Sequence, residues 1–173
     1  MTDFGLFIKN IPYLCSKVQE DHGKVLNIAS YICKRYLTEF GVCIDEMKLH
    51  KLLYFMQREC LIQLGEPMFD AKFKAWKYGP VMLEIRQHYK DDTLNMELSP
   101  SSKNKYDKVF GRVFAQYAPN RSWSFSTLSH GEYSWKKAQE GYSSYDSCDV
   151  DIETEDIRKD AERISIRRFL SFS

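Results

Sequence analysis

Residues 47–86 decide the fold: MKLHKLLYFMQRECLIQLGEPMFDAKFKAWKYGPVMLEIR. Asp45 stands where a helix N-cap is expected, and Gly65 followed by Pro67 stops the helix that it starts. Apolar residues recur at helical spacing between these two signals. The predicted buried stripe comprises Leu49, Leu52, Leu53, Met56, Cys60 and Leu64. Tyr54 belongs to the same run.

After the turn, the period of the sequence changes from that of a helix to that of a strand. Phe69, Ala71, Phe73 and Ala75 alternate with polar residues, which predicts one short strand over 69–75. The segment Tyr78-Gly79-Pro80 then predicts a turn. Pro80 is expected to be the first residue of a helix that runs to about Tyr89, because the missing proline N–H is not needed at that position.

Working outward, one-sided apolar patterns predict further helices over 24–40, ended by Gly41, and over 106–117. Two short helices are expected at 124–130 and 132–140, and a last one is expected to be capped by Thr154. The predicted fold is therefore mainly α: a compact bundle of about six helices with a small β-strand or hairpin near residues 68–76. Residues 1–22 are expected to form an arm or short helix, residues 23–165 the domain, and residues 166–173 a tail.

Composition excludes several classes of protein. The 25 basic and 24 acidic side chains leave a net charge of +1, which provides no global attraction to nucleic acid or to an anionic membrane. No apolar run is long enough to span a membrane, and the start MTDFGLFIKN does not resemble a signal peptide, so a cytoplasmic protein is expected. The five cysteines are irregularly spaced and contain no Cys-x-x-Cys pair.

The chain also lacks the local signatures of catalysis and of cofactor binding. It contains no Gly-x-Ser-x-Gly, no phosphate-binding glycine loop and no His-Glu-x-x-His. The four histidines are scattered along the sequence. We therefore expect no catalytic residues, no cofactor and no metal ion, although assembly of an enzyme site from distant residues stays open.

The successive blocks of this sequence resemble the Panacea domain, a phage-associated family. The resemblance is carried by the run Met47-Lys48-Leu49-x-Lys51-Leu52-Leu53-Tyr54, the Gly65-x-Pro67-x-Phe69 turn and the segment Phe73-x-Ala75-Trp76-x-x-Gly79-Pro80. A later block, Leu128-Ser129-His130 with Trp135-Lys136-x-Ala138, completes it. The resemblance implies an antitoxin of a toxin-antitoxin system, without catalytic residues, that binds a toxin protein directly. The gene beside this one is the expected source of that toxin.

Within these blocks we assign two kinds of role. Leu49, Leu52, Leu53, Tyr54, Gly65, Pro67, Gly79 and Pro80 are predicted to be structural. The candidate partner-binding residues are Phe73, Lys74, Trp76, Lys77, Tyr78 and Trp135, since aromatic residues at a strand-to-turn junction are frequent interface anchors. The alternative for Trp76 is a structural plug between strand and helices.

Two charged segments are further candidates for partner contacts. The acidic stretch 146–156 could meet a basic toxin, and Lys72, Lys74 and Lys77 could meet an acidic one. Simple solvated faces are the alternative for both. For the whole protein, the alternatives to an antitoxin are an adaptor that delivers a partner to a protease and a small enzyme of unrecognised chemistry.

Overall fold

The computed structural model describes the backbone of residues 11–143 and 148–171, and the side chains of the same ranges from residue 24 onward. These residues form seven helices and three short strands. The helices are α1 (Ile11–Phe40), α2 (Glu46–Leu64), α3 (Leu83–Lys90), α4 (Pro100–Tyr117), α5 (Ser122–His130), α6 (Tyr133–Ala138) and α7 (Thr154–Ser171). The strands are β1 (Phe73–Trp76), β2 (Gly79–Val81) and β3 (Asp151–Ile152). The predicted mainly helical fold with a small sheet is confirmed.

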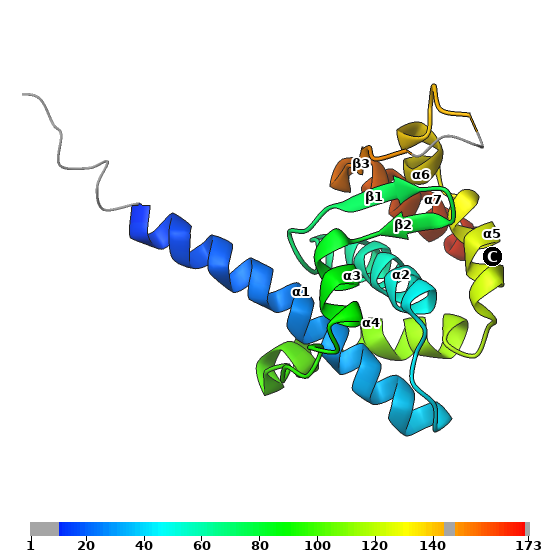
Figure 1. Cartoon of the computed structure of the whole chain (residues 1–173). Coiled ribbons are helices and arrows are strands. Elements are labelled where there is room, and N and C mark those ends of the chain that lie inside the picture. The colour runs from blue at the N-terminus through cyan, green and yellow to red at the C-terminus, as the bar shows by residue number, and fades with distance from the viewer. Residues whose placement is uncertain (1–10, 144–147, 172–173) are drawn as a thin grey trace, which may run out of the picture.

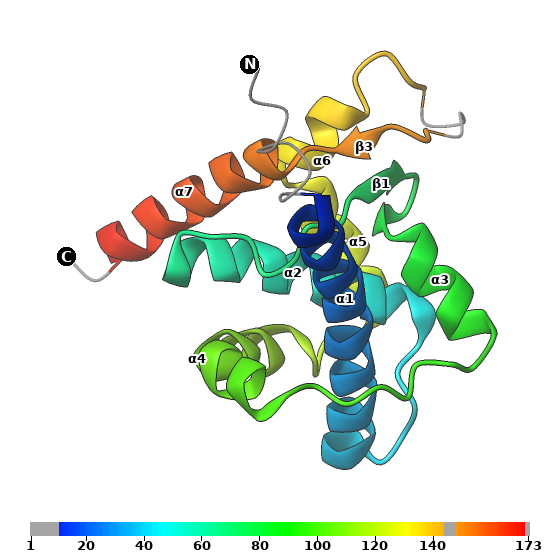
Figure 2. The same cartoon turned by 90° about the vertical axis from the view of Figure 1, so that its left-hand side faces the viewer.

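Helix α2 runs through the middle of the molecule. It contacts α1, α3, α4, α5, α7 and β2, and Figure 2 shows it between α7 and α4, with α1 crossing in front. The sheet lies over the same helix (Figure 1). Every other layer of the fold is therefore built around the segment 46–64.

The signals at both ends of α2 act as predicted. The Asp45 side chain accepts a hydrogen bond from the N–H of Lys48 at 2.9 Å, and Gly65 ends the helix in the left-handed conformation with φ of 72°. Leu49, Leu52 and other members of the predicted stripe are fully buried. Leu64 is the exception: it is 42% exposed, because it lies in the last turn, beyond the helices that cover α2.

Polar residues of α2 are buried as well, because each is bonded to a neighbouring element. The Gln57 side chain donates to the Phe69 carbonyl at 2.9 Å and accepts from the Met68 N–H at 2.8 Å, which fixes the turn after the helix. Glu59 accepts two hydrogen bonds from the Arg168 guanidinium of α7, at 2.9 and 2.8 Å. Such paired charges link α2 to its neighbours.

The sheet has the strand order β2-β1-β3, and both pairings are antiparallel. Trp76 is opposite Gly79 and Ala75 is opposite Pro80, so Lys77 and Tyr78 form the turn of a β1–β2 hairpin. The prediction that Pro80 starts a helix is wrong, since Pro80 lies in β2 and α3 begins only at Leu83. A proline is tolerated there because β2 is an edge strand.

Several predicted boundaries also shift. The first strand covers Phe73–Trp76 instead of 69–75, and α1 extends N-terminally beyond the predicted start at residue 24 to Ile11. Of the predicted arm 1–22, residues 1–10 lie outside the described residues. Helix α4 begins at Pro100, capped by Ser99, and thus starts six residues before the predicted range 106–117. Among the described residues, no helix has the length and apolar character needed to cross a membrane.

Candidate functional site

The β1–β2 hairpin presents an exposed aromatic pair together with α5. Tyr78, in the hairpin turn, is 48% exposed, and Trp123 of α5 is 66% exposed. The two rings meet edge to face, with centroids 5.6 Å apart. Tyr78 and Trp123 are called the aromatic ridge below. Large aromatic side chains of this kind are frequent energetic anchors of protein interfaces.

The hairpin backbone is held from behind by side chains of α2, α5 and the α6 region, which donate hydrogen bonds to its carbonyl groups. The pairs are Gln139 Nε2 to Ala75 O, Trp135 Nε1 to Trp76 O at 3.1 Å, Ser126 Oγ to Tyr78 O at 3.1 Å, and Lys51 Nζ to Pro80 O at 3.1 Å. We call this set the carbonyl clamp. It fixes the shape of the turn through the main chain, so the ridge is preorganised before any partner arrives.

His130 adds a fifth contact to the hairpin. Its ring stacks on Trp135 with centroids 4.1 Å apart, and it is hydrogen-bonded to the backbone of Lys77. Burial lowers the pKa of His130, the Lys77 backbone bond opposes this shift, and the nearby Lys51 reinforces it. His130 and Trp135, both from the later sequence block, therefore help to hold the hairpin of the earlier one.

Gly79 allows this close packing. Its φ is +103°, a conformation that residues with a side chain rarely adopt, and a Cβ atom at this position would lie 2.5 Å from Ser129 Oγ and 2.8 Å from Lys51 Cε. The predicted structural role of Gly79 thus has a specific cause. The backbone must approach α2 and α5 at van der Waals distance for the clamp to form.

Two hollows lie on either side of the hairpin turn and share Lys77 and Tyr78. The α2 pocket, of about 700 Å³, lies between the first turns of α2, the hairpin and α3. Its walls include Glu46, Met47, His50, Lys51, Trp76 and Arg86. The α5 pocket, of about 380 Å³, includes Trp123, Thr127, His130, Trp135 and Gln139. Concave sites with apolar walls and a few converging polar groups are the usual places where ligands and anchor side chains bind.

The α2 pocket has a buried polar side. Burial lowers the pKa of Lys51 to about 7 and the pKa of His50 to about 3, the latter with help from the charges of Lys51 and Arg86. His50 Nδ1 accepts a hydrogen bond from the Met82 N–H at 3.3 Å.

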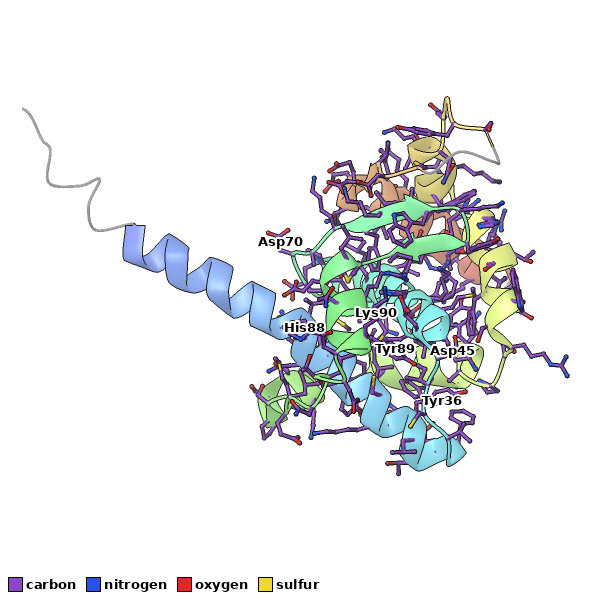
Figure 3. All side chains as sticks on the ribbon, viewed as in Figure 1. Tyr36, Asp45, Asp70, His88, Tyr89 and Lys90 are labelled. Atoms are coloured by element: carbon purple, nitrogen blue, oxygen red, sulfur yellow. The ribbon has the colours of Figure 1, made fainter. Side chains whose placement is uncertain are left out.

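Tyr89 of α3 donates a hydrogen bond to the Ile44 carbonyl at 2.8 Å. This contact holds α3 beside the start of α2, where Figure 3 labels Tyr89 and Asp45.

The two charged segments that were considered as separate partner sites pair with each other instead. Lys72 Nζ lies 3.1 Å from Glu153 Oε1, and Lys74 Nζ lies 2.9 Å from Asp151 Oδ1. These ion pairs cross from β1 to β3 and its flanking residues, because the two strands are neighbours in the sheet. Asp146 and Ser147, at the start of the acidic stretch, lie outside the described residues. In the described part of that stretch, the acidic side chains therefore do not form a separate free surface, and Lys72 and Lys74 do not form a free basic one.

The structure divides the predicted partner-binding residues. Phe73 does not belong to a surface, because it is completely buried against Tyr54 and Phe69. Lys74 is engaged in its ion pair with β3. The other four come together around the hairpin: Trp76, Lys77, Tyr78 and Trp135.

Trp76 and Trp135 both combine packing with partial exposure. The Trp76 indole lies under the Arg86 guanidinium, 5.1 Å from the ring centroid, and its N–H is 3.4 Å from Asp149 Oδ1. The bonded N–H fits the alternative that Trp76 is a structural plug, while the side chain also lines the α2 pocket. Trp135 donates to the hairpin and lines the α5 pocket. Each residue can serve the scaffold and the surface together.

Sequence reasoning missed three residues of this region: Trp123, His50 and Lys51. The available signal for Trp123 was an aromatic residue in a Ser-rich segment with no apolar period around it. Lys51 stands in the run that carries the family resemblance, but neither it nor His50 was assigned to the site, because a polar residue on a helix is ordinarily assigned to the solvent face. Both are 1% exposed here, since α2 is covered on all sides along most of its length. Among the described side chains, no three potential ligands converge to hold a metal ion.

Comparison with known proteins gives the family of this chain. The sequence profile of the family described as "Antitoxin SocA-like, Panacea domain" matches residues 49–136, just over half of the 173-residue chain. The matched range starts in α2 and ends in α6, so it includes the hairpin and all but one of the carbonyl-clamp donors.

A curated relative gives a shorter match. The chain is 45% identical over 38 residues to Antitoxin SocA of Caulobacter vibrioides (strain NA1000 / CB15N), which is 22% of this chain and 20% of that protein. The chain thus aligns with only a fifth of the relative's length. No solved structure matches. The family match over half of the chain, supported by this relative, shows that the protein belongs to the SocA-like Panacea-domain antitoxin family.

Proposed function

We propose that this protein is an antitoxin that neutralises a cognate toxin by forming a stoichiometric complex with it. Family membership indicates the antitoxin role. The observation that carries the mechanism is the aromatic ridge: Tyr78 is exposed on a turn whose backbone is fixed by the carbonyl clamp, and the exposed Trp123 of α5 packs against it. A rigid, exposed aromatic pair loses little conformational entropy when a partner covers it.

The hollows beside the ridge support a protein partner. An interface gains most of its affinity from a few anchors seated in pockets, with polar groups around them that select the partner. The ridge supplies two anchors to the toxin, and the α2 and α5 pockets can receive anchors from it. Lys77, between the two pockets, contributes to partner choice through its charge. Burial of this region would occlude the toxin without a chemical step.

The first experiment expresses the gene beside this one alone and together with a tagged copy of this chain. Growth rescue together with a stable complex supports direct neutralisation. Rescue accompanied by disappearance of the partner supports delivery to a protease instead. If the product of the neighbouring gene is harmless and does not co-purify with this chain, the proposed function is wrong.

A pair of variants then locates the interface. Trp123→Ala and Leu170→Ala remove side chains of similar exposure, 66% and 65%, from opposite parts of the molecule. Both should leave the fold intact, because exposed side chains contribute little to stability. We expect Trp123→Ala to weaken the complex about tenfold or more, as hot-spot residues do, and Leu170→Ala to leave it unchanged. The reverse result would move the interface to the C-terminal end of α7.

A further inference from the structure

The α2 pocket contains one buried hydrogen-bond donor that lacks a partner among the described residues, His50 Nε2. His50 is 1% exposed, and its Nδ1 accepts the Met82 N–H, so the neutral ring carries its proton on Nε2. Nε2 is buried without a hydrogen-bond partner, and the nearest carboxylate oxygen, Glu46 Oε1, is 3.6 Å away. A buried donor left in this state costs roughly 1–3 kcal/mol. A ligand acceptor at this point would recover that free energy.

Lys51 provides a second donor on the same side of the pocket. It is 1% exposed, and its Nζ donates to the Pro80 carbonyl, which leaves further N–H capacity. Burial lowers the pKa of Lys51 to about 7, so this nitrogen readily takes up a proton when an anion approaches. His50 and Lys51 are consecutive residues that both line the pocket, so two buried donor side chains belong to the same wall.

Both carboxylates of the pocket wall are engaged by donors of the protein. Asp45 accepts from the Lys48 N–H at 2.9 Å and from the Ser122 hydroxyl at 2.6 Å. Glu46 is bound by the Arg86 guanidinium. The charge of Glu46 is therefore balanced by a neighbouring cation, while His50 Nε2 keeps no hydrogen-bond partner in the described part of the chain. An unpartnered donor beside a second cationic donor favours an anionic acceptor.

The rest of the pocket is apolar and open to the hairpin surface. Met47, Val81 and the rings of Trp76 and Tyr78 line the hollow of about 700 Å³. This space accepts an apolar side chain next to the carboxylate site. In a main-chain terminus that ends in an apolar residue, the carboxylate and the apolar side chain are both bonded to the last Cα atom. Tyr78 also belongs to the aromatic ridge, so the pocket is continuous with the proposed toxin contact.

We propose that the α2 pocket binds the C-terminal carboxylate of the toxin chain, with His50 and Lys51 as donors and the apolar wall around the last side chain of the toxin. This proposal rests on the proposed function for the source of the chain end. Capture of a chain terminus by a cluster of donors is a recurrent mode of peptide recognition.

The test uses the full chain and three small probes followed by NMR titration: N-acetyl-leucine, its primary amide, and acetate. N-acetyl-leucine should bind about tenfold more tightly than the amide, since charge-assisted hydrogen bonds depend on the carboxylate, and should perturb the signals of His50 and Lys51. Acetate should bind at least about tenfold more weakly than N-acetyl-leucine, because it lacks the apolar group.

Lys51→Met should abolish the preference for the acid, whereas Lys108→Met should retain it. Lys108 is exposed on α4 and serves as the matched control for loss of one positive charge. Equal binding of acid and amide, or a preference that survives in Lys51→Met, would overturn the proposal. Acetate binding as tightly as N-acetyl-leucine would also overturn it, since a site for bare carboxylates does not recognise a chain end.

A final comparison separates this proposal from the proposed function. The co-purified neighbour is expressed with and without its last three residues. Loss of binding on truncation supports the pocket assignment. Unchanged binding overturns it while direct neutralisation stands, and failure of the full-length neighbour to bind removes the proposed function first.

Discussion

Replacement of Gly79 by alanine tests whether the close approach of the hairpin to α2 and α5 stabilises the fold. The φ of +103° makes any side chain at this position strained, at a cost of about 1–3 kcal/mol. The added Cβ would lie 2.5 Å from Ser129 Oγ and 2.9 Å from Lys51 Nζ, and relief of such overpacking costs about 1–3 kcal/mol more. The expected loss is about 2–6 kcal/mol, a large part of the ~5–15 kcal/mol typical of a domain.

Gly65→Ala is the matched control for this substitution. Gly65 also has a positive φ, of 72°, but its Cβ would meet no atom within 4 Å, so only the backbone cost of about 1–2 kcal/mol applies. Urea denaturation followed by circular dichroism measures both variants, provided that the m-values agree. If Gly79→Ala loses no more free energy of unfolding than Gly65→Ala, the contacts with Ser129 and Lys51 are not limiting and the reasoning fails.

A double substitution separates the two costs. Gly79→Ala combined with Ser129→Ala removes the nearest contact, and the pair should be less destabilising than the sum of the single variants by about 0.5–3 kcal/mol. Strict additivity would mean that the contact with Ser129 contributes nothing to the loss, which would then come from the backbone and the contact with Lys51.

Three other predictions concern buried and exposed charges. Burial lowers the pKa of Lys51 to about 7 in the folded chain, so between about pH 7 and 10 the unfolded chain binds more protons at Lys51 than the folded chain does. The free energy of unfolding should therefore rise with pH by up to about 1.4 kcal/mol per pH unit. Urea denaturation at pH 7 and 9 measures this rise, and Lys51→Met should remove the part that Lys51 contributes. Asp160→Ala should cost about 2–4 kcal/mol in the same assay, because Asp160 is fully buried and accepts the first two N–H groups of α6 at 2.8 and 2.9 Å; a loss below 1 kcal/mol would contradict its capping role. Lys72→Ala should lower the free energy of unfolding only slightly and become neutral in high salt, since Lys72 and its partner Glu153 are both exposed; a loss that high salt does not change would refute this.

Sequence patterns predicted the helices better than the sheet. Asp45 and Gly65 delimit α2 through local hydrogen bonds and backbone conformation, both of which depend on neighbouring residues in the chain. For Pro80 the prediction was wrong: the rule for helix starts placed it in the first turn of a helix, but it pairs with Ala75 across the hairpin turn, in a strand at the edge of the sheet. β3 has only two residues, too few for alternation to be recognised.

The candidate site was predicted in part for the same reason. Tyr78 and Trp76 could be identified because aromatic residues at a turn have a local signature. Lys51 and His50 could not, because their burial follows from helices that surround α2 and are distant in sequence. The pairing of Lys74 with Asp151 likewise depends on the neighbouring strands β1 and β3, and the separate segments give no indication of it.

The carbonyl clamp has a consequence for how such a protein can diversify. Its hydrogen bonds end on main-chain oxygens, and every residue has such an oxygen whatever its side chain. Residues 77 and 78 can therefore change without altering the carbonyl clamp that shapes the turn. Gly79 and the donor side chains of the clamp cannot change without altering it. A lineage that meets a new toxin could thus exchange the residues at the tip of the hairpin and keep the rest of the domain unchanged.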